Sequence, residues 1–263
     1  MSRNQEFKIR NAVLHADDDV FVVSKPAGLL SIADRFDPNL PSLRQILEEE
    51  FGEVLTVHRL DRDTSGVMLF ARHAEAHREL NRQFAERAVY KLYHALVGGV
   101  MREDEMKVDI PIAPNPVRKG LMMPSVRGKE ALTLLKVLQR FRMATLVECD
   151  LRTGRQHQIR VHLAAIGHAL LVDPDYGESD GFLLSSIKRR YNLAKNTIER
   201  PIIGRVTLHS RTVRFNHPAT GEQMEFTAEY PKDFSAVLQV LNKYAPHFEK
   251  FNWEQEFGSD EWE

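Results

Sequence analysis

Short runs rich in β-branched and aromatic residues recur along the whole chain, and they constrain the fold more than any other feature of the sequence. Runs of this length and composition are typical of β-strands, and turns such as Asn216-His217-Pro218 separate some of them. Because these runs are mixed with helical patterns, the sequence predicts an α+β domain with a largely antiparallel sheet. The predicted strands are 20–24, 67–71, 92–97, 131–138, 144–149, 206–213 and 224–228.

Two segments show the apolar spacing of surface helices, 42–51 behind a serine cap and 72–88 with apolar residues four apart. The segment 178–205 interrupts the strand pattern, is basic, and is predicted to be a helical insertion. We therefore expect one domain over 12–245 that includes this insertion. It is followed by an acidic tail over 246–263, which is either a peripheral helix or disordered.

The composition is that of an ordinary globular protein, with 43% apolar and 28% charged residues in a chain of 263. The N-terminal residues are polar, and the longest nearly apolar stretch, 161–172, is interrupted by His162 and His168. No signal peptide or membrane span is therefore expected. The single cysteine, Cys149, rules out an internal disulfide and a cysteine-based metal site, and the cytoplasm is the expected compartment.

The formal net charge of -1 hides an uneven distribution. The segment 118–160 holds ten basic and three acidic residues, whereas 247–263 holds one basic and six acidic residues. A basic segment of this kind could attract a nucleic acid through counterion release, or its charges could simply solvate strand faces. Charge alone leaves both interpretations open.

The segment 58–66, His-Arg-Leu-Asp-Arg-Asp-Thr-Ser-Gly, is a dense polar loop of the kind that often carries chemistry. The spacing of Asp61 and Asp63 approaches that of a calcium-binding loop. However, Arg72 stands where the bidentate glutamate should be, and a strand follows, so calcium is excluded. Two carboxylates could also serve glycoside hydrolysis, which remains an alternative. The purely structural interpretation is a turn in which one aspartate caps backbone amides.

A second polar segment, 151–162, reads Leu-Arg-Thr-Gly-Arg-Gln-His-Gln-Ile-Arg-Val-His. Thr153 followed by Gln156 fits a capping box, and apolar residues recur with helical spacing behind it. The pattern predicts a helix over 154–166 that Gly167 ends.

The charged residues of this helix allow two interpretations. Arg160 flanks the apolar stripe, so its guanidinium either pairs with a carboxylate from another loop or extends into water. Arg155 falls in the first predicted turn, where a cation is unfavourable unless an anion such as phosphate lies between it and the helix. The offsets of His157, His162 and His168 do not place them on one face, so a zinc site is not expected.

Four segments, in this order, resemble motifs of the RluA-type pseudouridine synthase family: 25–30 (KPAGLL), 58–66, 91–99 (KLYHALVGG) and 151–168. Each is ambiguous alone, but the combination is specific and covers most of 12–232. The resemblance implies a mixed, largely antiparallel sheet with flanking helices and a central cleft. It also implies that uridines in ribosomal or transfer RNA are converted to pseudouridine, without a cofactor or metal. The early position of the first motif implies a form without the S4-like domain of some members.

The resemblance also implies roles for individual residues. Asp61 matches the essential carboxylate, Tyr93 the ring that stacks on the target base, and Arg160 the partner of Asp61. Arg59 would help to fill the space that the flipped uridine leaves. Position 172 departs from the family pattern, with valine where glycine is usual, a change expected to affect packing.

The chemistry of this isomerisation agrees with the implied roles. A carboxylate under the ribose acts either as a nucleophile at C1′ or as a base at C2′, and the sequence does not choose between them. A charged carboxylate in a dry pocket needs a cation beside it, which favours the paired interpretation of Arg160. RNA phosphate contacts are then expected from Lys91, Arg155 and the basic residues of 118–142.

Three further expectations stay open. Lys25 either contacts RNA or only stabilises its turn. A catalytically inactive RNA-binding protein on the same scaffold is the alternative to the enzyme, although binding alone does not require a carboxylate that faces RNA. A monomer is expected, because the sequence shows no sustained interface pattern.

Overall fold

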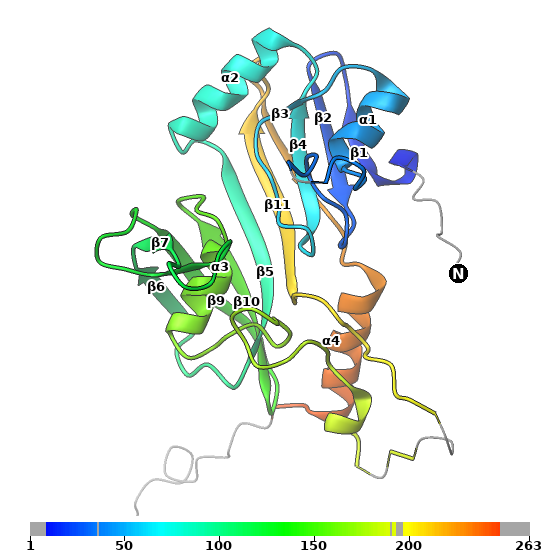
Figure 1. Cartoon of the computed structure of the whole chain (residues 1–263), viewed down its shortest axis with the longest axis vertical. Helices are drawn as coiled ribbons and strands as arrows, with labels where there is room; N and C mark the ends of the chain where they lie inside the picture. Colours follow the sequence, from blue (N-terminus) through cyan, green and yellow to red (C-terminus); the bar gives the residue numbers. More distant parts are fainter. Residues whose placement is uncertain (1–8, 36, 190, 193–196, 248–263) are drawn as a thin grey trace, which may run out of the picture.

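The computed structural model describes residues 9–35, 37–189, 191–192 and 197–247, and a single large sheet runs through them (Figure 1). The strands of this sheet are β1 (Val13–Ala16), β2 (Val20–Lys25), β3 (Leu55–Thr56), β4 (Ser65–Ala71), β5 (Tyr90–Gly98), β6 (Glu105–Asp109), β9 (Leu132–Arg140), β10 (Ala144–Leu151), β11 (Leu208–Asn216) and β12 (Gln223–Thr227). Their order is β1-β2-β4-β11-β5-β10-β9-β6, with β12 paired to β11 and β3 paired to β4. All pairings are antiparallel except that of β11 with β4. The predicted α+β fold with a largely antiparallel sheet is confirmed.

The one parallel pairing requires a glycine. Gly66 lies opposite Ser210, has a φ of 115°, and leaves so little room that a Cβ atom there would lie 2.1 Å from the Ser210 carbonyl oxygen. Only glycine combines this backbone conformation with so close an approach. The contact places the loop before β4 beside the centre of the sheet.

Alternation along the strands gives the sheet two apolar faces. On β2, Phe21 and Val23 pack in one core cluster, while Val20 and Val22 pack in another. Helices α1 (Leu43–Phe51) and α3 (Gln158–Ala165) contribute to the first cluster, and α2 (Ala74–Ala85) contributes to the second. Because side chains on a strand alternate between faces, these helices cover opposite sides of the sheet.

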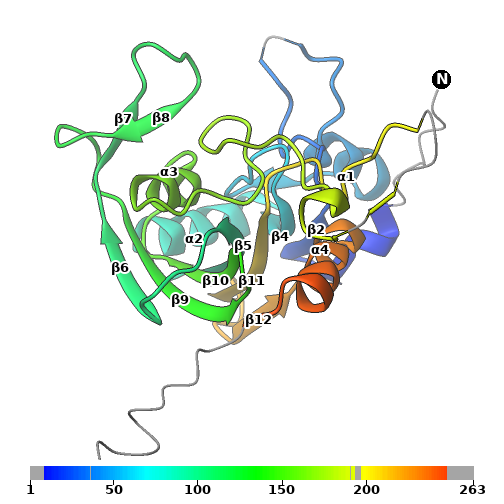
Figure 2. The ribbon, with the colours of Figure 1, turned by 90° about the horizontal axis from the view of Figure 1, so that it is seen from below.

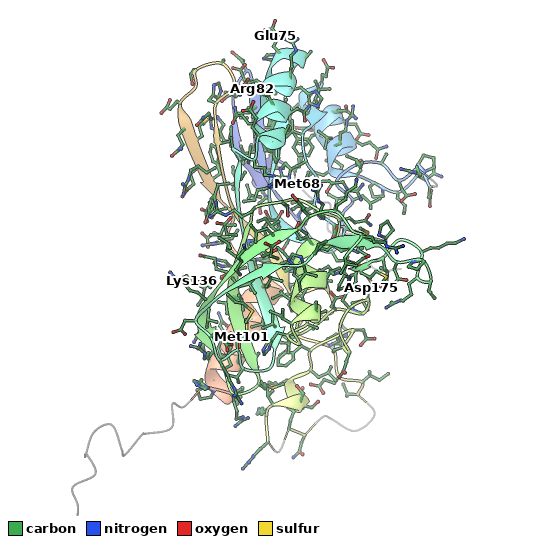
Figure 3. All side chains as sticks on the ribbon, turned by 90° about the vertical axis from the view of Figure 1, so that its left-hand side faces the viewer. Met68, Glu75, Arg82, Met101, Lys136 and Asp175 are labelled. Carbon is green, nitrogen blue, oxygen red and sulfur yellow. The ribbon has the colours of Figure 1, made fainter. Side chains whose placement is uncertain are left out.

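The two helices predicted near the N-terminus are confirmed with small changes at their ends. Ser42 caps α1 and forms a capping box with Gln45. Helix α2 is shorter than the predicted 72–88 segment. Its buried Ala76 and Leu80 face the sheet, whereas Figure 3 shows Glu75 and Arg82 on its outer surface.

Helix α3 begins four residues later than predicted, and the predicted capping box is wrong. The Thr153 hydroxyl donates to the side-chain oxygen of Gln158 at 2.8 Å, and that oxygen also accepts from the amide of Arg155 at 3.0 Å. Residues 154–157 therefore form a turn closed by Gln158. The N-cap position is His157, whose side chain makes no capping hydrogen bond.

A fourth helix, α4 (Lys232–Tyr244), was not predicted from the sequence. It buries Phe234, Val237 and Leu241 in a cluster with Leu96 of β5 and Leu146 of β10. Figure 1 shows α4 beside the lower part of the sheet.

The helical prediction for 178–205 is wrong for the part of the segment that the structure describes. There the only helical element is a short 3-10 turn, Leu184–Ser186. Residues 190 and 193–196 of this segment, and 248–263 of the acidic tail, lie outside the described residues. No described helix is long and apolar enough to cross a membrane.

A separate hairpin projects from the sheet. Strands β7 (Ile112–Pro114) and β8 (Met122–Pro124) pair only with each other among the described strands, and we call residues 112–124 the β7–β8 arm. Figure 2 shows this arm on the same side of the molecule as the loop between β2 and α1, with α3 beside it.

Candidate active site

Asp61 lies in the loop between β3 and β4, and the backbone of this loop is fixed by a buried serine. The Ser31 hydroxyl donates to the carbonyl of Leu60 at 2.7 Å and accepts from the amide of Leu60 at 3.1 Å. Ser31 and Leu60 are both buried. The residue before Asp61 therefore has both backbone groups satisfied, which holds Asp61 in one position.

Lys25 also fixes this loop. Its ammonium group donates to two carbonyls of the 26–29 turn, at 2.9 and 2.7 Å, and to the carbonyl of Arg62 at 2.9 Å. The side chain is 1% exposed, so all three donors are used inside the protein. The prediction that Lys25 contacts RNA is wrong, and its alternative, a turn-stabilising lysine, describes the residue.

Replacing Lys25 by methionine tests this role. The variant removes the ammonium donor from three partly buried carbonyls, of which that of Arg62 still accepts from the amide of Gly28 at 2.9 Å, so we expect the free energy of unfolding to fall by about 2–4 kcal/mol. Urea denaturation measures the loss. A matched change at the exposed Lys107 should cost less than about 0.5 kcal/mol. Equal stability of the two variants would contradict the role given to Lys25.

Arg160 is buried, with 5% of its surface exposed, and its main partner is Asp173. Nε lies 2.8 Å from Asp173 Oδ2 and Nη2 lies 2.7 Å from Oδ1, while Nη2 also contacts Asp175 Oδ2 at 2.7 Å. Nη1 lies 4.0 Å from Asp61 Oδ2. Burial acts to lower the pKa of Arg160, but the hydrogen bonds and charge of Asp173 outweigh it and raise this pKa above its ordinary value.

The structure therefore brings Asp61 and Arg160 together. The Arg160 guanidinium is held in place by its hydrogen bonds to Asp173, and Asp61 is its more distant partner. The interpretation in which Arg160 extends into water is wrong, because the helix buries this position. Asp173 has no exposed surface and was missed as a site residue. A buried arginine signals a carboxylate partner, but the sequence offers many carboxylates and does not say which one is near.

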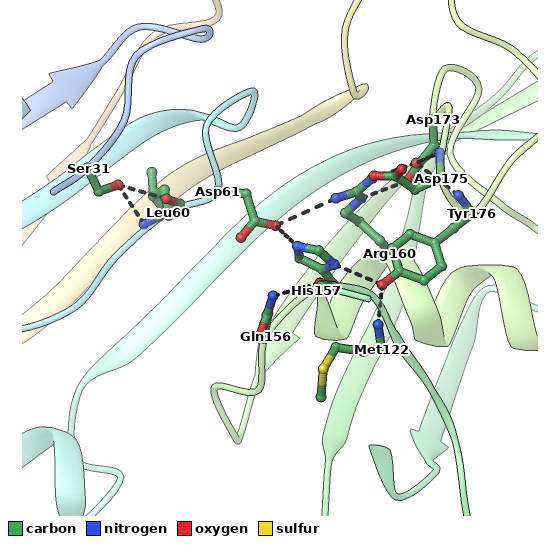
Figure 4. A network of polar contacts seen from close by, with 11 residues as sticks. Ser31, Leu60, Asp61, Met122, Gln156, His157, Arg160, Asp173, Asp175 and Tyr176 are labelled. Carbon is green, nitrogen blue, oxygen red and sulfur yellow. Dashed lines mark hydrogen bonds and ion pairs between the residues drawn. The ribbon is translucent and has the colours of Figure 1, made fainter. Parts of the chain in front are cut away.

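His157 is a second residue that sequence reasoning missed as a neighbour of Asp61. Its Nε2 lies 3.8 Å from Asp61 Oδ2, and its Nδ1 lies 2.8 Å from the hydroxyl oxygen of Tyr176 (Figure 4). Burial lowers the pKa of His157 below its ordinary value, against the opposing charge of Asp61. The side chain is 13% exposed, so a largely neutral imidazole faces the carboxylate at neutral pH.

Tyr93 comes from the middle of β5, where its neighbours across the sheet are Cys149 and Ser210. Only 7% of it is exposed. Burial raises the pKa of Tyr93 to about 12, so its hydroxyl stays protonated at neutral pH.

Asp61, Tyr93 and Arg160 line one small cavity of about 70 Å³. Thr64 lines it as well, and its buried hydroxyl makes no hydrogen bond with any part of the chain that the structure describes. The cavity thus combines a partly exposed carboxylate, an aromatic ring, a fixed cation and an unused hydroxyl. These are the groups that would hold and attack a polar, planar ligand.

A larger cleft of about 650 Å³ shares Asp61 and Tyr93 with this cavity. Among its described lining residues the only carboxylate is Asp61, whereas five are basic: Arg59, Arg87, Lys91, Arg152 and Arg155. A concave surface with this charge favours an anionic ligand such as a phosphate backbone.

Three of the predicted RNA-binding residues lie in this larger cleft. Arg59 is exposed, Lys91 lies with its amine 5.7 Å from the centre of the Phe84 ring, and Arg155 donates from Nε to the carbonyl of Glu130 at 2.9 Å. Burial lowers the pKa of Lys91, and the charge of Asp150 acts in the opposite direction. Because α3 begins only after Arg155, the argument from the helix dipole does not apply to this residue.

One cluster outside these cavities places three potential metal ligands, from Asp17, Asp19 and His217, within 4.8 Å of one another. His217 Nδ1 accepts from the amide of Thr220 at 3.2 Å, so its ring proton is on Nε2, which faces Asp17 Oδ2 at 3.3 Å. A nitrogen that binds a metal must be deprotonated. The geometry therefore describes a hydrogen-bonded histidine and carboxylate, not a metal centre.

A family model and several similar sequences indicate the same protein family. The model of the RNA pseudouridylate synthase family matches residues 19–165. An uncharacterized RNA pseudouridine synthase of Aquifex aeolicus is 36% identical over 247 residues, covering 89% of this chain and 74% of that protein. Ribosomal large subunit pseudouridine synthase D of Nitrosomonas europaea is 34% identical and covers 89% of this chain and 66% of its own length. The protein of the same name from Pseudomonas aeruginosa is 35% identical, with 88% and 72% covered.

Solved structures agree with these sequence matches. Human RNA pseudouridylate synthase domain containing 1 superposes with a TM-score of 0.67 and 27% identity, over 93% of this chain and 91% of that one. Human RNA pseudouridylate synthase domain containing 4 gives the same TM-score with 25% identity, over 89% and 94%. The chain therefore belongs to the RNA pseudouridine synthase family, whose members isomerise uridine in RNA.

Proposed function

We propose that this enzyme isomerises specific uridines of structured ribosomal or transfer RNA at Asp61, with the target nucleotide flipped toward the place where the small cavity and the larger cleft share Asp61 and Tyr93. The proposal is supported by one observation: a partly exposed Asp61 carboxylate lies 4.0 Å from the buried Arg160 and lines the same cavity as Tyr93. In the reaction, the bond from N1 to C1′ breaks, the base turns, and C5 bonds to C1′. The proton on C5 is lost and N1 gains one, so no atom is added or removed.

The surroundings of Asp61 suit a carboxylate that must act while it is charged. Arg160 Nη1 lies 4.0 Å and His157 Nε2 3.8 Å from Asp61 Oδ2, so both are close to the carboxylate without a direct hydrogen bond that would occupy the oxygen. The side chain is 27% exposed, so its reactive edge is open to the cavity. This arrangement serves attack on C1′ and removal of a proton from C2′ equally well.

Tyr93 would stack on the flipped base, and two variants separate its ring from its hydroxyl. Tyr93→Ala should lower the single-turnover rate by roughly 10- to 100-fold, because stacking contributes about 1–3 kcal/mol per base. Tyr93→Phe keeps the ring, so we expect it to retain stacking while an impaired rate reports the hydroxyl. An unchanged rate for Tyr93→Ala would contradict the stacking role.

The basic residues of the larger cleft would bind the RNA backbone around the target. Flipping a base costs a few kcal/mol, and Arg59, Lys91 and Arg155 are placed to offset this cost through phosphate contacts and by filling the vacated space. We expect the RNA affinity to fall steeply with added salt, with a shallower slope for Arg155→Gln. Binding measured at 50 to 200 mM salt tests this, and a flat response would exclude the proposed surface.

Large-subunit ribosomal RNA is the first substrate to test, because several relatives carry that substrate in their names. Specificity would come from the loops 34–41 and 114–129 and from the insertion 178–205, which lie outside the catalytic motifs. We further propose a monomer that works in the cytoplasm. Mapping of pseudouridine in total RNA from cells with and without the gene identifies the target. No difference between the two RNA pools would contradict the proposed activity.

A further inference from the structure

Two hydrogen bonds connect the β7–β8 arm to His157, whose imidazole faces the Asp61 carboxylate at 3.8 Å. The amide of Met122, the first residue of β8, donates to the Tyr176 hydroxyl oxygen at 2.8 Å. The same oxygen lies 2.8 Å from Nδ1 of His157, and Nε2 of that ring faces Asp61 (Figure 4). Each step joins a different segment of the chain, so the arrangement does not follow from local sequence.

The protons of these two hydrogen bonds can be assigned in one consistent way. Because the phenol oxygen accepts the amide proton of Met122, its own proton is available for Nδ1 of His157. The ring then carries its single proton on Nε2 and directs it at the carboxylate. In the opposite tautomer, the phenol oxygen would accept two N–H groups and its own proton would need a further acceptor.

The backbone at His157 is strained in a way that serves this orientation. His157 has a φ of 55° and a ψ of 19°, the left-handed region, and Arg87 is the only other described residue besides glycine with a positive φ. It occupies the N-cap position of α3 without capping the helix. Strain of this kind persists where the surrounding structure maintains it and is frequent at functional sites. Here it aims the imidazole at Asp61 instead of at the helix.

We propose that His157 is a positioning residue for the Asp61 carboxylate, and that the β7–β8 arm sets its orientation through the hydroxyl of Tyr176. The inference rests on the proposed role of Asp61. The neutral ring lies 3.8 Å from the carboxylate with Nε2–H toward it, and so limits the positions that the carboxylate can take without transferring a proton to it. A change at the arm that breaks the contact with Tyr176 releases the ring and loosens the carboxylate.

Other contacts tie the arm to the same two segments. The side-chain amide of Gln156 donates from Nε2 to the carbonyl of Gly120 at 3.0 Å, and Arg118 Nη1 donates to the carbonyl of Asp175 at 2.7 Å. The arm and the residues just beyond it expose four cations, Arg118, Lys119, Arg127 and Lys129. RNA held by these cations would keep the arm in the position that orients His157, so binding of the substrate and alignment of the carboxylate are linked.

Tyr176→Phe is the most direct test, because it removes the hydroxyl and keeps the ring. The ring packs 4.8 Å from the Arg160 guanidinium, and this contact remains. We expect the single-turnover rate at saturating RNA and neutral pH to fall roughly five- to tenfold, the effect of losing one hydrogen bond in the transition state. RNA affinity should stay within about twofold. Tyr244→Phe at the end of α4 is the matched control and should leave both quantities unchanged.

The pH profile distinguishes positioning from packing. His157 is faced by Asp61 of the loop before β4, by Arg160 of α3, and by Asp173, Asp175 and Tyr176 of the segment after α3. The carboxylates favour a protonated ring, whereas burial, Arg160 and the donated phenol proton favour a neutral one. Without the phenol proton the ring gains a proton at a higher pH, and the imidazolium draws the carboxylate toward itself. In Tyr176→Phe, the acid limb of the pH–rate profile should therefore move to higher pH.

A second variant keeps the test decisive. His157→Gln retains an N–H donor of similar reach but cannot titrate, so adding Tyr176→Phe to it should not move the acid limb further. An unchanged rate and pH profile in Tyr176→Phe would overturn the proposal, and so would a loss confined to RNA affinity. Substantial turnover by a folded Asp61→Asn enzyme would instead refute the role of Asp61, and the Tyr176→Phe outcomes do not mimic that result.

Discussion

Replacing Asp61 by asparagine is expected to abolish turnover while the protein stays folded. The amide can neither attack C1′ nor accept a proton from C2′, so the rate should fall at least about a thousandfold. The carboxylate is 27% exposed and lies 3.8 Å from the neutral His157 ring and 4.0 Å from the Arg160 guanidinium, so the free energy of unfolding should change by less than about 1 kcal/mol. Single-turnover conversion of uridine in a ribosomal RNA fragment measures the first effect, and urea denaturation the second.

The loop supplies its own control for this experiment. Asp63 lies two residues beyond Asp61 and is exposed, so Asp63→Asn should retain most of the activity. Asp61→Ala repeats the test without an amide that could hydrolyse back to a carboxylate. Isomerisation by either folded Asp61 variant, at a rate near that of the Asp63 variant, would show that another group performs the chemistry.

The sequence was sufficient for the general fold and for the central residues of the site. Strands were predicted from short runs rich in β-branched and aromatic residues, and in the structure successive residues of such a run pack on two apolar faces, as Phe21 and Val22 do on β2. Asp61, Tyr93 and Arg160 were predicted from family motifs, and the structure brings them to one cavity. Their catalytic roles stay predictions until the variants are measured.

The neighbours of these residues could not be predicted in the same way. The partner of Arg160 is Asp173, and the orientation of His157 depends on Tyr176, and both partners come from the segment after α3. Which side chain fills a space between segments depends on tertiary packing, which spacing along one segment does not encode. The left-handed backbone conformation of His157 could not be predicted from the sequence either, because the residue is not a glycine or an asparagine.

Two errors have local causes. The capping box was assigned to Thr153 and Gln156, but Gln158 accepts both from the Thr153 hydroxyl and from a backbone amide, and so closes a turn before the helix. The sequence left open whether Lys25 contacts RNA or stabilises its turn, because a lysine in a turn is normally exposed. Three carbonyls converge on its amine instead, a feature that only the folded chain reveals. By contrast α4 had a readable signal, since Phe234, Val237 and Leu241 recur with helical spacing.

Removing the guanidinium of Arg160 is expected to have the largest effect on stability. Arg160→Met leaves Asp173, which has no exposed surface, as an unpaired buried carboxylate, so the free energy of unfolding should fall by about 3–5 kcal/mol. Adding Asp173→Asn removes that charge and keeps an oxygen for the amides of Asp175 and Tyr176, at 3.0 and 3.1 Å. Most of the lost stability should therefore return in the double variant.

The double variant also separates the structural role of Arg160 from its role beside Asp61. If the cation is needed only to neutralise Asp173, activity should return together with stability. If a positive charge beside Asp61 is also needed for the reaction, turnover should stay reduced by roughly a hundredfold in the stable double variant, as we expect. Arg205→Met is the matched control, because Arg205 pairs bidentately, at 2.7 and 2.9 Å, with Asp233. The Asp233 side chain is 34% exposed and stays solvated without its partner, so the change should cost only about 1 kcal/mol. Urea midpoints and single-turnover rates measured on all three proteins decide between the two roles, because only the catalytic one leaves a stable enzyme inactive.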